Sequence, residues 1–244
     1  MTGARAKDGR QLRWEKHKRE RRQVVIDAAV EVLEQHPPGE AIHVQQIADR
    51  AGIHRTVLYR HFDDRTDLDL AVQTEICRRA GDTVIAAMSL EGTPSQITHR
   101  IVATFVEWMV AHPALVRFVE RDLSGGPSGR DATPLEQALQ QVAERVELLI
   151  HSVVQVLGTD LPEDSRDALD PFVFGLIGSG FQTTKRWASR AELRPPTGEF
   201  IEMLSRNIWR QITGMAADQG IDLPDVPVEQ LLALLASPTT TPGA

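Results

Sequence analysis

A short helix, a glycine and a second short helix follow one another between residues 43 and 65. This segment reads HVQQIADRAGIHRTVLYRHFDDR, and Gly52 stands where the first helix must end and the chain must turn. Its apolar residues are spaced to pack two helices together, and its alanines allow close approach: Ile47, Ala48, Ala51, Ile53 and Leu58. The pattern predicts a helix-turn-helix, whose second helix can enter a DNA major groove about 12 Å wide.

The exposed side of the second helix is predicted to carry polar side chains that donate hydrogen bonds. These residues are His54, Arg55, Thr56, Tyr59, Arg60 and His61. Such groups can reach phosphates or base edges in a groove. The alternative is a surface pair of helices that binds nothing, and a helix–glycine–helix pattern alone does not exclude it.

The match around this segment is closer than a generic pattern. Over about residues 20–70 the chain resembles the DNA-binding region of the tetracycline-repressor (TetR) family of bacterial regulators. The residues that carry the resemblance are Val25 to Ala29, Ile47, Ala48, Ala51 to Ile53, Leu58 to Phe62, and Arg65. The resemblance implies a DNA-binding transcriptional regulator, generally a repressor, rather than an enzyme.

The resemblance also implies roles for particular residues. In the family the recognition helix begins near the position of His54, and the positions of Tyr59, His61 and Arg65 contact phosphates. The position of Gln45, on the preceding helix, often touches DNA. Base or backbone contacts that vary within the family fall on Arg55, Thr56 and Arg60.

Three positions depart from the family pattern. His43 and His54 stand where Ser or Thr commonly begins the two helices, and Val57 stands where a hydroxyl residue is frequent. A poor cap costs about 1 kcal/mol, so we expect these short helices to be less rigid. Val57 either contacts a thymine methyl group or packs within the protein.

Cations gather near the N-terminus although the whole chain is acidic, with a net charge of −7. Residues 1–22 hold nine Lys or Arg and three Asp or Glu. A local basic face attracts phosphate whatever the total charge, and family members with such arms bring these cations to phosphates or to the minor groove. We expect Arg21 and Arg22 to contact phosphates. Glu15 and Glu20 leave open a helix that merely pairs its own charges.

The rest of the sequence has helical periodicity and no convincing strand alternation, which predicts an all-α fold. We expect an N-terminal three-helix helix-turn-helix domain joined to a larger antiparallel helical domain. The expected boundaries are a flexible basic arm at 1–13, the DNA-binding domain at 14–66, an effector-binding and dimerisation domain at 67–236, and a flexible tail at 237–244.

Composition indicates a cytoplasmic protein without a membrane partner. No run approaches 18 apolar residues, and the basic N-terminus lacks the apolar segment of a signal peptide. Cys77 is the single cysteine, so an intrachain disulfide is excluded and a reducing compartment fits.

A homodimer is expected, because two helix-turn-helix units related by a two-fold axis can read a palindromic operator. The candidate interface lies on helices near 165–190 and 197–217. The first carries small residues and the second an apolar stripe: Gly175, Gly178, Ser179 and Gly180, then Leu204, Ile208, Trp209 and Ile212. The alternative is that the apolar stripe belongs to the core of one chain.

The family resemblance implies a small effector in the larger domain, and the residue types there suggest a mostly apolar ligand. The candidate lining residues are Phe105, Trp108, Met109, Phe118, His151, Phe172, Ile177 and Phe181. The alternative is that these residues are ordinary core. The long helix expected at about 65–87 would link the ligand to the DNA-binding domain.

A metal-dependent enzyme and a protein–protein adaptor are the alternative classes. The eight histidines form no HExxH pair, and no GxxxxGK[ST], GxSxG or dinucleotide-binding motif occurs. We therefore expect no catalysis, no metal and no cofactor. An adaptor would fold well and lack salt-sensitive binding to duplex DNA.

Overall fold

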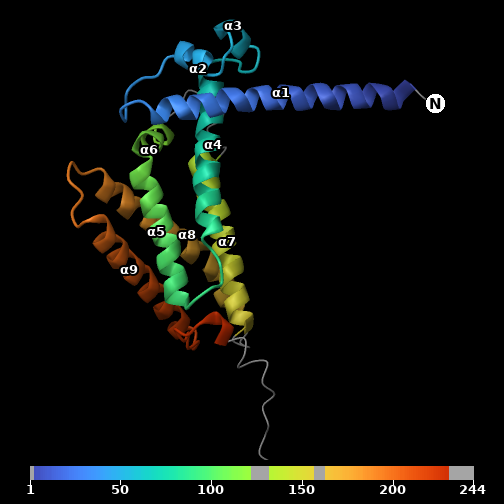
Figure 1. The fold of residues 1–244 in the computed structure, drawn as a ribbon. Coiled ribbons are helices and arrows are strands. Elements are labelled where there is room, and N and C mark those ends of the chain that lie inside the picture. The colour runs from blue at the N-terminus through green and yellow to red at the C-terminus, as the bar shows by residue number, and fades with distance from the viewer. Residues whose placement is uncertain (1–2, 122–131, 157–162, 231–244) are drawn as a thin grey trace, which may run out of the picture. The chain divides into compact units, whose positions relative to one another are not determined.

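The structure is a computed structural model that describes residues 3–121, 132–156 and 163–230. Over these residues it contains helices and no β-strand, which confirms the all-α prediction (Figure 1). In chain order the helices are α1 (Gly3–Glu34), α2 (Val44–Arg50), α3 (Arg55–Leu58), α4 (Arg65–Ala86), α5 (Pro94–Ala111), α6 (Pro113–Val119), α7 (Pro134–Val156), α8 (Glu163–Ala188) and α9 (Thr197–Asp218).

Helix α1 begins well before the predicted start of regular structure. The sequence predicts a flexible arm over residues 1–13, whereas the structure is helical from Gly3. Alanine, lysine, arginine, glutamine and leucine dominate this stretch and have high helix propensity, and the first proline is Pro37. The expected tail at 237–244 and most of the loop expected at 124–133 lie outside the described residues.

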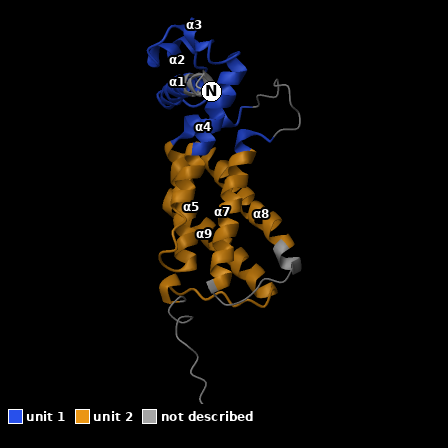
Figure 2. Ribbon diagram, turned by 90° about the vertical axis from the view of Figure 1, so that its right-hand side faces the viewer, with its two compact units in different colours: residues 1–78, 112–135 blue, residues 79–111, 136–244 orange. Residues whose placement is uncertain are grey.

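The chain divides into two compact units (Figure 2). Unit 1 comprises Met1–Arg78 and His112–Leu135, and unit 2 comprises Arg79–Ala111 and Glu136–Ala244. Helix α4 therefore contributes residues to both units. The boundary expected at residue 66 falls earlier on the chain than the end of the first segment of unit 1.

The core of unit 1 is built from the helix faces that the sequence pattern predicted. Ile47, Ala48 and Leu58 are completely buried, together with Val25 and Ala29 of α1. Helix α6 belongs to this unit because the buried amide of Gln73, on α4, donates hydrogen bonds to three carbonyls at the end of α6. The acceptors are the carbonyl oxygens of Phe118, Val119 and Arg121, at 3.0, 3.3 and 3.1 Å.

Unit 2 has its own apolar core, made mainly by α5 and α9 with contributions from α8. Trp187 and Phe200 stack with their ring centroids 4.2 Å apart, and Leu204 is buried in the same cluster. Ile208 packs against this cluster, so part of the predicted interface stripe on α9 lies in the core of one chain. Among the described residues, no single helix is long and apolar enough to cross a membrane. Helices α5 and α6 meet this criterion of length and composition only when they are taken together, and the chain bends between them.

Candidate nucleic-acid interface

The turn between α2 and α3 is made at Gly52, as the sequence predicted. Gly52 has a φ of +66°, a left-handed conformation that glycine adopts without steric penalty. Its N–H donates to the carbonyl of Asp49 at 3.1 Å, and the N–H of Ile53 donates to the carbonyl of Ala48 at 3.0 Å. These bonds satisfy carbonyls at the end of α2 and set the direction in which α3 leaves.

Helix α3 is shorter than predicted. The sequence pattern predicts a helix that continues to about Phe62, but α3 ends at Leu58 and residues 59–61 form a turn. The N–H groups of Arg60 and His61 donate to the carbonyls of Val57 and Leu58, at 3.1 and 2.9 Å. The tightening lets the ring of Phe62, which is 1% exposed, enter the core. The predicted DNA-contacting residues Tyr59, Arg60 and His61 therefore lie on this turn.

The first turn of α3 is capped by a histidine. His54 Nδ1 accepts a hydrogen bond from the Thr56 N–H at 3.3 Å and lies 2.8 Å from the Thr56 hydroxyl oxygen. Nδ1 therefore acts as the acceptor, as a serine or threonine oxygen does at this position. In the neutral ring the proton then sits on Nε2, which is left to donate. The expected loss of a cap at this position is wrong.

The start of α2 is held by a glutamine and a second histidine. The Gln46 side-chain oxygen accepts the N–H of His43 at 2.6 Å, one half of a capping box. The Gln46 amide nitrogen lies 2.9 Å from His36 Nε2, while His36 Nδ1 lies 2.6 Å from the carbonyl oxygen of Val32. This relay joins the end of α1 to the start of α2, so α2 is also capped in spite of His43.

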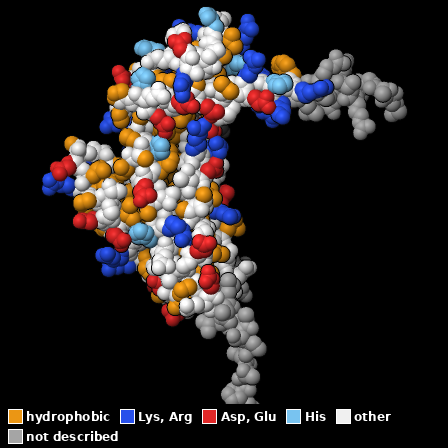
Figure 3. Space-filling view, viewed as in Figure 1, with side chains coloured by type: hydrophobic (Ala, Val, Ile, Leu, Met, Phe, Trp, Pro, Cys, Tyr) orange, Lys and Arg blue, Asp and Glu red, His pale blue; other side chains and the backbone are white. Residues whose placement is uncertain are grey.

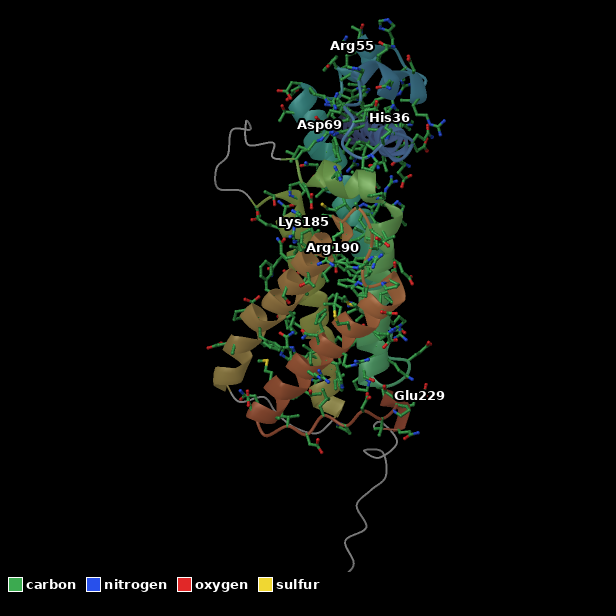
Figure 4. All side chains as sticks on the ribbon, turned by 90° about the vertical axis from the view of Figure 1, so that its left-hand side faces the viewer. His36, Arg55, Asp69, Lys185, Arg190 and Glu229 are labelled. Atoms are coloured by element: carbon green, nitrogen blue, oxygen red, sulfur yellow. The ribbon has the colours of Figure 1, made fainter. Side chains whose placement is uncertain are left out.

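The outer face of α3 and its turn is rich in exposed donors. Arg55, Thr56, Tyr59 and Arg60 are all exposed, and Figure 4 labels Arg55. The guanidinium carbon of Arg55 lies 5.8 Å from the centroid of the Tyr59 ring. Val57 is exposed to solvent only in part, which favours packing. Residues 54–61 include no acidic side chain, so an anionic groove meets only neutral and cationic groups on this face.

His61 sits among the cations of α1. Burial lowers the pKa of His61 from its ordinary value, and the positive charges of Arg21, Lys18 and Arg22 lower it further. Its Nδ1 is buried and has no hydrogen-bond partner among the described residues. The ring is therefore held neutral in a positive field, where an incoming phosphate would favour its protonation.

Two predicted phosphate contacts, Arg22 and Arg65, are engaged by partners within the protein. Arg22 donates to the carbonyl oxygen of His61 and to the carboxylate of Asp67. Arg65 Nε donates to both Asp69 oxygens at 2.8 and 2.9 Å, and Arg65 Nη1 donates to the carbonyl of Ile42 at 3.0 Å. Arg65 thereby fixes the start of α4 to the segment before α2.

Two other predicted DNA contacts, Arg21 and Gln45, are exposed. The Gln45 amide donates to the Asp49 carboxylate at 2.7 Å, one helical turn further along α2. Because Gln45 stays at the surface, its side chain can exchange this partner for a phosphate oxygen.

The described part of α1 before residue 22 is exposed almost throughout, and Figure 3 shows blue cationic side chains along it. Lys16 and His17 both lie near Glu20, with N–O separations of 3.8 and 3.1 Å. Trp14 is 64% exposed, with the Lys18 ammonium 5.7 Å from its ring centroid. Some charges pair within the helix, but most of its cations face solvent. An open hollow of about 330 Å³ on this helix is lined by Glu15, Lys18, Arg19 and Arg22.

Comparison with known proteins decides what this helix-turn-helix belongs to. A sequence model of the family described as "Bacterial regulatory proteins, tetR family" matches residues 25–72. An uncharacterised HTH-type transcriptional regulator of Mycobacterium tuberculosis is 28% identical over 214 residues, which cover 87% of this chain and 86% of that protein. Residues 25–72 are the DNA-binding domain of a TetR-family regulator. The protein is a DNA-binding transcriptional regulator and not an enzyme.

Solved structures of TetR-family proteins share the fold. A TetR-family transcriptional regulator from Streptomyces coelicolor superposes with a TM-score of 0.60 at 20% identity, covering 92% of each chain. A protein from Mesorhizobium loti described as a TetR-family regulator gives a TM-score of 0.59 at 14% identity, covering 82% of this chain and 96% of its own. The likeness extends over both the helix-turn-helix and the larger helical part.

The structure places the predicted effector-lining residues in different surroundings. In unit 2 the rings of Phe105 and Phe181 lie 6.2 Å apart. Phe172 and Ile177 pack against a separate cluster formed by Ala143, Leu169 and Val173. Four further predicted residues are Met109, which is buried, Trp108, which is half-buried, His151, which is exposed, and Phe118, which is buried in unit 1.

Two titratable groups outside the DNA-facing surface, Cys77 and Glu147, have raised pKa values. Burial raises the pKa of the Cys77 thiol to about 12, so this cysteine stays protonated. Burial and the nearby Asp170 raise the pKa of Glu147, whose Oε1 has no hydrogen-bond partner in the described chain. No sequence pattern singles out Glu147, because its isolation depends on how α7 packs. Among the described residues, no group of three or more His, Cys, Asp or Glu is placed to hold a metal ion.

Proposed function

We propose that this TetR-family regulator is a ligand-responsive repressor that binds a palindromic operator as a homodimer. The observation that carries the proposal is the exposed, acid-free face of α3 and its turn, held on a helix-turn-helix whose two short helices are both capped. A preorganised face loses little conformational freedom on binding, which favours a specific complex.

The exposed residues take different parts in this contact. Arg55, Thr56 and Arg60 are long or polar enough for base edges, and an arginine that reads a guanine discriminates by about 1–3 kcal/mol. Phosphates are expected at Tyr59 and His61, which flank Arg60 on the turn. Further phosphate contacts are expected from His54 Nε2, Gln45 and Arg21.

The helical form of the basic N-terminal segment limits the ways in which this segment can contact DNA. An α-helix with its side chains is about 10–12 Å across, whereas the minor groove of B-DNA is about 6 Å wide. A helix therefore does not enter the minor groove, and we propose that the exposed cations of α1 contact phosphates along its edge. This contact adds affinity and salt dependence but no direct reading of base pairs.

A homodimer through α8 and α9 is supported by a stripe on α8 that its own chain leaves uncovered. Phe174 and Gly175 are exposed, and a Cβ added at Gly175 or Gly178 meets no atom within 4 Å. Small residues let two helices approach closely, and Phe174 supplies apolar area beside them. The same face on a second copy would form a self-complementary contact.

The effector is proposed to be small and mostly apolar. The pairing of Phe105 with Phe181 supports an aromatic wall in unit 2. The effector lowers operator affinity only if it binds better to a conformation whose reading heads do not fit the half-site spacing. Helix α4 is the natural link, since it carries Arg65 at its start and continues into unit 2.

Selection of bound fragments from random duplex DNA by the purified protein tests the operator. The expected outcome is one enriched palindromic sequence, protected as two half-sites. Failure to enrich any sequence, or enrichment of a single unpaired half-site, contradicts the proposal.

A thermal-shift screen of lipophilic compounds, with hits titrated against labelled operator, tests the ligand response. By reciprocity, an effector that weakens operator binding must itself bind less tightly to the operator complex by the same factor. A hit that binds saturably without changing operator affinity is not the effector.

A further inference from the structure

Arg22 of α1 contacts three residues that follow the recognition helix: His61 on the turn, the buried Phe62, and Asp67 at the start of α4. Its Nη1 donates to the carbonyl oxygen of His61 at 2.6 Å, at the end of the turn. Its Nη2 donates to Asp67 Oδ1 at 2.9 Å, in the first turn of α4. Between these two contacts, the guanidinium carbon lies 4.2 Å from the ring centroid of the buried Phe62.

The partners of Arg22 are themselves fixed. Asp67 Oδ2 accepts the N–H of Asp63 at 3.1 Å, and the Asp67 N–H donates to Asp64 Oδ1 at 2.8 Å. Asp67 thus serves at once as acceptor for Arg22 and as a brace for the loop that starts α4. Loss of the guanidinium would leave the His61 carbonyl and the Asp67 carboxylate without this partner.

We propose that Arg22 is a positioning residue for DNA recognition, which clamps the turn carrying Tyr59 and His61 onto α1 and α4, and does not itself contact phosphate. The inference deepens the proposed DNA contact and rests on it. The geometry supports the assignment, because the planar guanidinium is used on one face by Phe62 and at its edge by two acceptors. An arginine in such a site is already neutralised by its carboxylate, and both of its terminal nitrogens already donate to acceptors within the protein.

The neighbouring Arg21 provides a matched contrast. It is one residue away on the same helix and exposed, and within the described residues it has no hydrogen bond or ion pair. The two arginines are therefore expected to act differently: Arg21 contributes positive charge at the DNA surface, while Arg22 holds the turn that carries Tyr59 and His61 in position.

Conservative and charge-removing variants at both positions test the assignment by operator affinity over a range of salt concentrations. Arg22→Lys keeps the charge but lacks the fork and the planar face, so we expect operator affinity to fall about tenfold, the equivalent of ~1.4 kcal/mol, with an unchanged salt slope. Arg21→Lys also keeps its charge, and it is expected to lose less operator affinity than Arg22→Lys because Arg21 has no clamp to break. Arg21→Ala is expected to lower the salt slope by about 0.9 for each phosphate that the variant leaves unneutralised. If Arg22→Lys retains affinity and Arg22→Ala lowers the slope as Arg21→Ala does, Arg22 is a phosphate contact and the proposal is wrong.

The variant Asp67→Asn is expected to change operator affinity in opposite directions for the two possible roles of Arg22, the clamp and the phosphate contact. A clamp weakened by loss of the carboxylate lowers operator affinity, whereas a phosphate-contacting Arg22 released from its acidic partner raises it. Asp63→Asn removes one negative charge from the same loop while keeping the Arg22 partner, and it measures the effect of charge alone. Affinity of Asp67→Asn at or above that of Asp63→Asn overturns the proposal.

Hydrogen exchange of the free protein keeps the clamp testable even if no operator is found. In Arg22→Lys the amides of Arg60 and His61 are expected to exchange faster, because the turn they close is no longer tied to α1. The amides of Ala51 and Gly52, which close the preceding turn, are expected to be unchanged. Unchanged exchange at Arg60 and His61 refutes the clamp, whereas a faster rate with no duplex binding by the wild type would refute only the DNA function.

Discussion

The ring nitrogen Nδ1 of His54 lies 2.8 Å from the hydroxyl oxygen of Thr56 and accepts the N–H of the same residue at 3.3 Å. The two side chains form one unit at the start of α3, where a serine or threonine is usual in the family. His54 therefore combines two tasks: Nδ1 satisfies a backbone donor, and Nε2 stays available to a phosphate.

His54→Ala is expected to lower the free energy of unfolding by about 1 kcal/mol, the usual contribution of a helix cap, and to weaken operator binding. His54→Ser is expected to keep the stability, because its hydroxyl caps the helix, and still to lose the phosphate donor. Chemical unfolding and operator titration of both variants separate the two tasks. Equal stability of His54→Ala and wild type would show that Nδ1 does not act as a cap.

The elements of the helix-turn-helix could be predicted because their signals are local. Gly52 marks the turn, and the spacing of Ile47, Ala48 and Leu58 identifies the buried faces of the helices. The structure confirms the turn at Gly52 and the burial of these three residues. The caps could not be predicted, because the spacing of apolar residues does not reveal that a histidine or a glutamine side chain will bond to a nearby backbone group.

The internal partners of the arginines depend on tertiary structure and leave no trace in local sequence. Arg22 and Asp67 are 45 residues apart, and Arg65 reaches Ile42 across 23 residues. A basic residue at a phosphate-contacting position therefore looks the same in sequence whether it faces DNA or a carboxylate. The effector residues show the same limit, since apolar spacing does not distinguish the buried core residue Met109 from a side chain that lines a ligand site.

The exposed cations of α1 are expected to act through charge alone. Replacing Lys16 and Arg19 together by alanine should lower the salt slope of DNA binding by up to about 0.9 for each phosphate that these side chains neutralise, for operator and random duplex alike. The ion pair of Lys16 with Glu20, at 3.8 Å on the surface, is too weak to withhold the lysine from DNA. Exchanging A·T for G·C pairs flanking the operator should change little, because a helix does not enter the minor groove. A slope equal to that of wild type would show that α1 stays clear of the DNA.

His61 should couple operator binding to proton uptake. Its pKa is lowered in the free protein by burial and by Arg21, Lys18 and Arg22, and a bound phosphate would raise it again. The complex then binds a proton at a higher pH than the free protein, so operator affinity rises as pH falls from the pKa of His61 in the complex to its pKa in the free protein. His61→Gln should weaken this pH dependence, measured at constant ionic strength. An unaltered pH profile in this variant would remove His61 from the phosphate-contacting set.

Asp67 should contribute stability that disappears on the acid side. Partial burial raises its pKa, but the hydrogen bond from Arg22, the backbone N–H of Asp63 and the charge of Arg22 outweigh burial and leave the pKa below 3.8. A carboxyl with a lowered pKa in the folded state stabilises the protein above its unfolded pKa, and this stabilisation disappears as pH falls through the folded value. Asp67→Asn should therefore reduce stability at neutral pH and flatten the acid limb of a stability–pH curve. A wild-type acid limb in Asp67→Asn would mean that the pair with Arg22 adds no stability.

Gly178 gives the sharpest test of the homodimer, because a side chain can be added there without disturbing its own chain. A Cβ at this position meets no atom within 4 Å, and Gly178 is a non-terminal residue of α8 with ordinary helical backbone. Gly178→Arg is therefore expected to fold, and the bulky charged side chain should separate two α8 helices that pack face to face. Sedimentation or light scattering should report a dimer for wild type and a monomer for the variant. Operator affinity should fall steeply, because a single reading head contacts only one half-site.

Gly81→Arg, on α4 with an equally open Cβ position, is the matched control for Gly178→Arg and should remain dimeric. Both variants add the same charge and volume to a helix, so a difference between them reports where the two chains meet rather than a general effect of arginine. A dimeric Gly178→Arg would place the interface elsewhere, and a monomeric wild type at micromolar concentration would contradict the homodimer itself.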